Sequence, residues 1–225
     1  MTNGTILDMR IMSIGANCAD ISILGDYRER GPVDNWRVEH GIEDAVTLFT
    51  GEFEKMVKED AWLEVKHKNP TFKGDGTKRF IYKTHQCFHI EMDNPEVKEK
   101  VLNRLQHFYD FIEEVKTKDD CYFCYVVAVK DQVKNGVRAF SDKFYENLDI
   151  LSKYIPLNKL IVIGTPKEQG IRSYFSAFSK EGTKGKTPYT DVKNVAFAYQ
   201  DKKNAPLAFA QFKGWVENEL CKSNS

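Results

Sequence analysis

The stretch "CYFCYVVAV", residues 121–129, decides the fold class of this chain. Every residue in it is apolar or aromatic. A near-continuous run of this kind predicts a β-strand that is buried on both faces, rather than one with a solvent-facing side. Strands of that type belong to parallel sheets whose two faces are covered by other elements.

The segments on either side of this stretch differ from it in period. Upstream, Asn94 and Pro95 form a helix start, because Asn caps the first turn and Pro suits the first helical position. Six apolar residues then follow at steps of three and four, the spacing of an amphipathic helix: Val97, Val101, Leu105, Phe108, Ile112 and Val115. Downstream, Ser141 caps a further expected helix, and "KLIVIGT" at 159–165 predicts a second buried strand.

The same alternation extends along the rest of the chain. We expect strands at 9–14 and 192–199, and helices at 43–57 and 206–220. Buried strands separated by helices favour βαβ units, so the sequence predicts an α/β fold. The expected architecture is three-layer, with a mostly parallel sheet and helices on both faces, in one domain spanning 1–225. The region from about 60 to 92 interrupts the rhythm and is expected to be a β-containing insertion, with strands at 79–83 and 87–92.

The composition excludes several function classes. Lys plus Arg and Asp plus Glu both number 33, so no global basic field favours a nucleic-acid partner. No apolar run approaches the length of a membrane span, and no signal peptide is evident, so we expect a cytoplasmic protein with no membrane partner. The five cysteines are then expected to be reduced thiols. A small molecule or peptide is the expected substrate, and the oligomeric state stays open.

Cys18 is the first candidate for chemistry. It follows Gly15, where the first expected strand ends. Ligands of open parallel sheets bind beyond the carboxyl ends of the strands, where the first strand-to-helix turn lies. The start of a helix stabilises a thiolate and offers N–H groups to an oxyanion, and Asn17 adds a further donor. Cys18 is therefore a candidate nucleophile, the alternative being a small residue that packs where the chain bends.

Two histidines supply a candidate base. His85 and His89 lie four residues apart, which places them on one face of an extended strand. A cysteine nucleophile needs a base, and histidine titrates near pH 7. The alternative is a pair of surface or hydrogen-bonded histidines. As metal ligands they lack a third clear partner, so neither a metal nor an organic cofactor is expected.

Three apparent signatures do not indicate a site. Cys121 and Cys124 spell C-x-x-C, but residues three apart on a strand face opposite sides. The run "KEGTKGKT" lacks the glycine that a phosphate loop needs four residues before "GKT", and no strand precedes it. His107 falls on the polar face of its helix and is expected to be solvated.

Three short motifs carry a resemblance to a known family. "SIGANC" at 13–18 fits the pattern S-[LI]-G-x-x-C, "PVDNW" at 32–36 is similar to a "PFDW" motif with one residue more, and "CFHIEM" at 87–92 is similar to an F-x-H motif. By these motifs the chain resembles a family of poorly characterised bacterial and viral proteins labelled papain-like cysteine peptidases. The family commonly has Asp after the histidine, where this chain has Ile90.

The resemblance implies a cysteine–histidine site built from Cys18 and His89. It adds Asp34 and Trp36 through the second motif, and Arg104 on the long helix, where the family tends to carry arginines. A papain fold has no serial βαβ units with the nucleophile after the first strand. The periodicity therefore predicts a different architecture, and the resemblance bears on the chemistry alone.

Two functional hypotheses follow, beside a third possibility that the protein is a purely structural partner of another protein. In the first, the protein is a hydrolase or acyl transferase with Cys18 as nucleophile, His89 as base, and Asp34 as the group that orients the imidazole or binds substrate. Asn17, Trp36, Arg104 and His85 are the expected substrate-binding residues. In the second, the same sheet edge binds a sugar, nucleotide or other anionic ligand without covalent chemistry.

Overall fold

A computed structural model describes part of the chain. The described residues are 9–15, 24–32, 42–59, 63–65, 79–82, 85–88, 94–126, 141–164, 195–197, 212–214 and 216. For 63–65, 79–82, 85–88, 126, 163–164 and 195–197 the backbone alone is described. Everything below refers to these residues.

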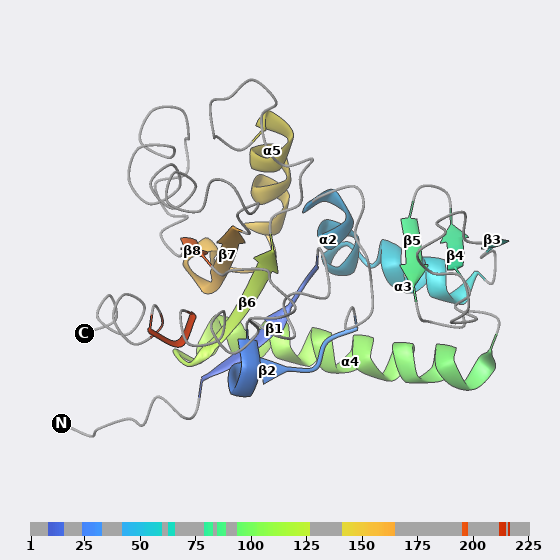
Figure 1. Cartoon of the computed structure of the whole chain (residues 1–225), viewed down its shortest axis with the longest axis horizontal. Coiled ribbons are helices and arrows are strands. Elements are labelled where there is room, and N and C mark those ends of the chain that lie inside the picture. The colour runs from blue at the N-terminus through green and yellow to red at the C-terminus, as the bar shows by residue number, and fades with distance from the viewer. Residues whose placement is uncertain are drawn as a thin grey trace, which may run out of the picture.

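The centre of the molecule is a five-stranded sheet in which every pairing is parallel (Figure 1). Its strands, in spatial order, are β2 (Arg28–Glu29), β1 (Arg10–Ser13), β6 (Cys121–Val126), β7 (Leu160–Gly164) and β8 (Val195–Phe197). The predicted α/β class is confirmed. Strands β1, β6, β7 and β8 fall within the expected strand segments, whereas β2 lies outside them.

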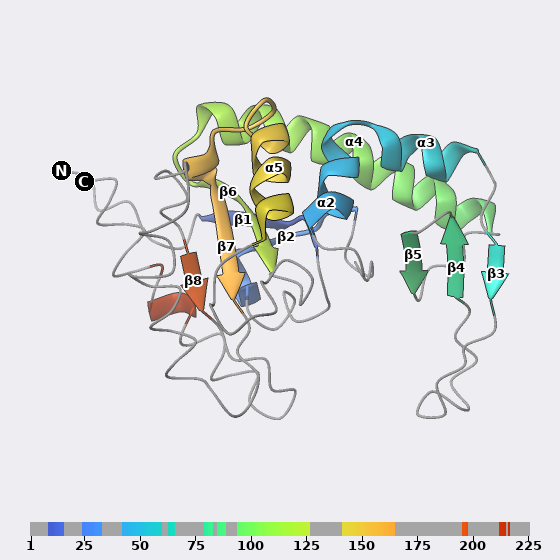
Figure 2. The ribbon, with the colours of Figure 1, turned by 90° about the horizontal axis from the view of Figure 1, so that it is seen from above.

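Helices pack on one face of this sheet (Figure 2). They are α2 (Ile42–Phe49), α3 (Glu52–Lys58), α4 (Pro95–Thr117) and α5 (Asp142–Leu151), with short 3-10 turns at Gly25–Tyr27 and Leu157–Lys159. The single helix expected at 43–57 is wrong. The chain breaks between α2 and α3 at Gly51, whose φ of +76° is left-handed backbone that favours glycine.

Helix α4 forms as its sequence predicts. The side chain of Asn94 accepts a hydrogen bond from the Glu96 N–H at 3.0 Å, and Pro95 is the first helical residue. The apolar stripe is buried against the sheet, where the ring of Phe123 on β6 packs edge-on against Phe111 at 5.2 Å between centroids. Phe108 also lies in this aromatic cluster. Burial of these rings anchors α4 across β6.

Both faces of the parallel sheet are buried. Phe123 and Tyr125 belong to the core shared with the helices, whereas Tyr122 and Cys124 point to the opposite face and are 2% and 0% exposed. This alternation is the pleat of a strand covered on two sides. Among the helices of the described residues, none has both the length and the apolar character required to cross a bilayer.

A second, smaller sheet is formed by residues that lie between β2 and β6 in the sequence. It is antiparallel, with the order β3 (Leu63–Val65), β4 (Arg79–Tyr82) and β5 (His85–Phe88). It lies beside α3 and the first half of α4, and β5 is its strand nearest to α2 in both views (Figures 1 and 2). Strand β5 begins at His85 rather than at the expected Cys87, and His85 is in antiparallel register with Tyr82 of β4.

Candidate functional site

The order of the parallel strands selects one edge of the sheet as the place for a ligand. Going outward from β1, the chain places β2 on one side and β6 on the other, so the direction of winding reverses between β1 and β6. In doubly wound sheets, ligands bind in the crevice beyond the carboxyl ends of the strands at this reversal. The candidate site is therefore the edge at which β1, β2 and β6 end.

The described part of this edge is closely packed. Ser13, the last residue of β1, is 2% exposed, and its hydroxyl accepts a long hydrogen bond from the Gly15 N–H at 3.4 Å. A Cβ added to Gly31 would lie 3.0 Å from the Met12 Cγ and 3.2 Å from the Ser13 carbonyl oxygen. The turn after β2 is thus held directly against the end of β1.

Two helix starts face the same edge. Helix α5 leads from β6 back to β7, so its first turn lies on the carboxyl side of the sheet. The Ser141 hydroxyl caps it by accepting from the Phe144 N–H at 3.2 Å, as predicted. An ion pair between Lys143 and Glu43 joins the first turns of α5 and α2. The partial positive charge of both helix starts is therefore close to this edge, although Glu43 and Asp44 offset part of it in α2.

Most of the predicted site residues lie outside the described residues: Asn17, Cys18, Asp34, Trp36 and His89. Two others have a described backbone. His85 is the first residue of β5, in register with Tyr82. Arg104 is half-buried near the middle of α4.

The two cysteines of β6 behave as expected. Cys121 and Cys124 are buried thiols, neither in a disulfide, on opposite faces of the strand. Burial and the negative charge of Asp120 raise the pKa of Cys121 to about 11, which disfavours the thiolate. Cys121 and Cys124 therefore form neither a redox pair nor half of a metal site. Across the described ranges, no group of three or more His, Cys, Asp or Glu side chains is arranged to hold a metal ion.

A charged cluster lies where β1 and β2 meet α4. The Glu29 carboxylate accepts from Arg10 Nε at 2.7 Å and lies 3.0 Å from His107 Nε2. Arg10 also pairs with Glu114, which accepts from Lys118 Nζ at 2.9 Å. Burial raises the pKa of Glu29, but the hydrogen bonds and charges of Arg10 and His107 outweigh it and lower the pKa below its ordinary value. His107 is thus a partner of Glu29 rather than the freely solvated residue expected.

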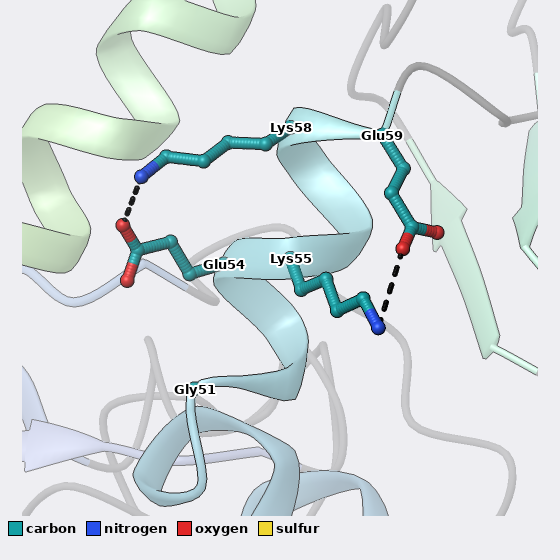
Figure 3. Close-up of a pocket in the computed structure, with 5 residues that line it drawn as sticks. All are labelled: Gly51, Glu54, Lys55, Lys58 and Glu59. Atoms are coloured by element: carbon teal, nitrogen blue, oxygen red, sulfur yellow. Dashed lines mark hydrogen bonds and ion pairs between the residues drawn. The ribbon is translucent and has the colours of Figure 1, made fainter.

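A pocket of about 460 Å³ lies on the surface of α3 (Figure 3). Its lining carries two ion pairs, Lys58 with Glu54 at 2.5 Å and Lys55 with Glu59 at 3.6 Å. Glu54 also accepts from the Tyr109 hydroxyl at 3.0 Å, and burial together with that carboxylate raises the pKa of Tyr109 to about 12. Each acid is matched by a neighbouring base on a solvated helix, so the pocket has no unmatched charge with which to select a ligand.

Comparisons with known proteins add no relative: no family model matches the chain, and searches of the curated proteins and of the solved structures find no match.

Proposed function

We propose that the protein is a cysteine-dependent hydrolase or acyl transferase in which Cys18 is the nucleophile and His89 the general base. Asp34 orients the imidazole or binds substrate, and Asn17 with N–H groups of its turn stabilises the oxyanion. Trp36, Arg104 and His85 contact a small-molecule or peptide substrate. The reaction takes place in the cytoplasm and uses no metal or organic cofactor.

The strand order is the observation that supports this proposal. The reversal lies between β1 and β6, and Cys18 comes five residues after β1 ends at Ser13. Asp34 comes three residues after Gly31, which packs against the same end of β1. Tethers of this length allow both candidate residues to reach one edge, where doubly wound sheets bind ligands.

The finer architecture forms part of the proposal. The sheet is the middle of three layers, because Tyr122 and Cys124 are buried on the face opposite α2, α4 and α5. The segment at about 60–92 is an insertion whose small antiparallel sheet carries the base. His89 directly follows β5, the strand nearest to α2 (Figures 1 and 2).

The chemistry is acyl transfer. His89 takes the proton of the Cys18 thiol, and the thiolate attacks the acyl carbon of an amide or thioester. The carbon–nitrogen or carbon–sulfur bond breaks, and the leaving group departs with the proton from His89. Water, deprotonated by His89, then attacks the acyl-thioester on Cys18, releasing the acid and restoring the thiol.

An activated ester tests the proposal without knowledge of the natural substrate. With p-nitrophenyl acetate, we expect release of p-nitrophenolate and a single acetyl group on the peptide that contains Cys18, seen by mass spectrometry. Cys18→Ser should abolish the adduct, and His89→Ala should slow its formation about 100-fold. Cys221→Ser is the matched control and should leave the rate unchanged.

The rival hypothesis predicts a different result. A protein that only binds an anionic ligand at this edge gives no acetylation of Cys18 beyond the rate of an ordinary thiol. An unchanged rate of adduct formation in His89→Ala would likewise remove His89 from the proposed site.

A further inference from the structure

Strand β2 is the least extensive strand of the parallel sheet. It has two residues, pairs with β1 at only two positions, and forms an edge of the sheet. The turn before it is anchored by Leu24 and Tyr27, which are 0% and 6% exposed, and the Tyr27 ring contacts Phe212. Between these anchors and Gly31, backbone pairing alone contributes little to the stability of the segment. Short segments at a sheet edge are the first to open locally.

One side chain of β2 reaches beyond its neighbouring strand. Glu29 uses both carboxylate oxygens: Oε2 accepts from Arg10 Nε of β1, and Oε1 lies 3.0 Å from His107 Nε2 of α4. These two ion pairs connect Glu29 of β2 to β1 and to α4. Glu29 therefore links the edge strand to both the sheet and the helix layer.

Further contacts between Arg10 and α4 extend this link. Arg10 is 5.2 Å from the centroid of the Phe111 ring and pairs with Glu114, and Glu114 pairs with Lys118. His107, Phe111, Glu114 and Lys118 recur at helical spacing on one side of α4. The side chains of Arg10 and Glu29 are 34% and 24% exposed. Each ion pair between such partly exposed groups is weak enough to break without loss of the fold.

We propose that Glu29 is a latch: its carboxylate fastens edge strand β2 to α4 and to the start of β1, and loss of its charge lets residues 28–31 open while α4 and β6 stay folded. The inference concerns the described residues and does not rest on the proposed function. Residues 28–31 include Gly31, which packs against the end of β1 at the candidate edge.

Hydrogen–deuterium exchange of the full chain at pH 7 tests the latch. Glu29→Gln keeps the shape of the side chain and removes its charge. We expect the amides of residues 28–31 to exchange about three- to tenfold faster, because two weak ion pairs are lost. Exchange in 105–115 and 121–125 should stay within about twofold of the wild type.

Glu54→Gln is the matched control, because Glu54 is also a partly exposed glutamate with two side-chain partners, Lys58 and Tyr109, but lies on α3. Glu54→Gln should leave the exchange rates of the amides of residues 28–31 unchanged. His107→Ala is the second variant: it removes the α4 partner at a helix position that tolerates Ala, and should give the same pattern with a smaller effect.

Two results would overturn the inference. One is unchanged exchange of residues 28–31 in both Glu29→Gln and His107→Ala. The other is equal acceleration in 28–31, α4 and β6, which would make Glu29 a stabiliser of the whole fold. If Glu29→Gln does not fold, the exchange rates of residues 28–31, α4 and β6 in His107→Ala test the inference by the same criteria.

Discussion

Gly31 is the residue at which the turn after β2 comes closest to the end of β1. The atoms that a side chain would meet there are the buried Met12 side chain and the carbonyl oxygen of Ser13. A backbone oxygen cannot move aside as a flexible side chain can. The close approach of Gly31 to the end of β1 therefore favours a residue without a Cβ, because a Cβ would displace Met12 or Ser13 by a few tenths of an ångström.

Gly31→Ala should destabilise the protein by about 1–3 kcal/mol, the usual cost of overpacking a tight site. The free energy of unfolding in urea measures this. Gly214→Ala is the control, because a Cβ there meets nothing within 4 Å. An equal effect of the two substitutions would mean that the turn after β2 moves away from β1 at little cost.

Local polar contacts could be predicted residue by residue, whereas distant ones could not. Asn94 and Ser141 cap their own helices, so both contacts follow from sequence position. The contact of Arg10 with Glu114 joins residues 104 positions apart, and nothing in either local sequence indicates the partner. His107 was placed correctly on its helix, but its partner Glu29 belongs to a strand that the sequence does not predict.

At the scale of elements, helix α4 was the most predictable. Its cap, its first proline and its apolar stripe all indicate the same helix. The boundary between α2 and α3 could not be predicted, because an isolated glycine is also tolerated inside helices, and only the left-handed φ of Gly51 ends α2. Strand β2 was missed because two residues are too few for any periodicity.

The start of α4 gives the prediction at this scale. Asn94→Ala should cost about 1 kcal/mol of unfolding free energy, because the Glu96 N–H loses its acceptor. Asn94→Asp should be nearly neutral, since a carboxylate also caps a helix start. Urea unfolding measures both variants, and equal losses in the two would contradict the role of the cap.

At the scale of the whole molecule, the sequence predicts the alternation of strands and helices but not the order of the strands. Alternation is a local pattern, whereas order depends on long-range pairing such as that of Arg10 with Cys121. The order is what selects the edge at β1, β2 and β6. The motifs therefore predict a type of site, whereas the edge at which it is proposed to lie follows only from the strand order.

The central claim is that Cys18 is an activated thiol at this edge, and competition between the cysteines of one chain tests it most directly. At about pH 6, the protein is treated with limiting iodoacetamide and the modified peptides are mapped by mass spectrometry. We predict that Cys18 reacts before Cys221, because in the proposed site a helix start and His89 would both favour its thiolate, and that His89→Ala loses most of this preference. Buried Cys121 and Cys124 should stay unmodified. Reaction of Cys221 before Cys18 at every pH would contradict the claim and favour a site that binds its ligand without a nucleophile.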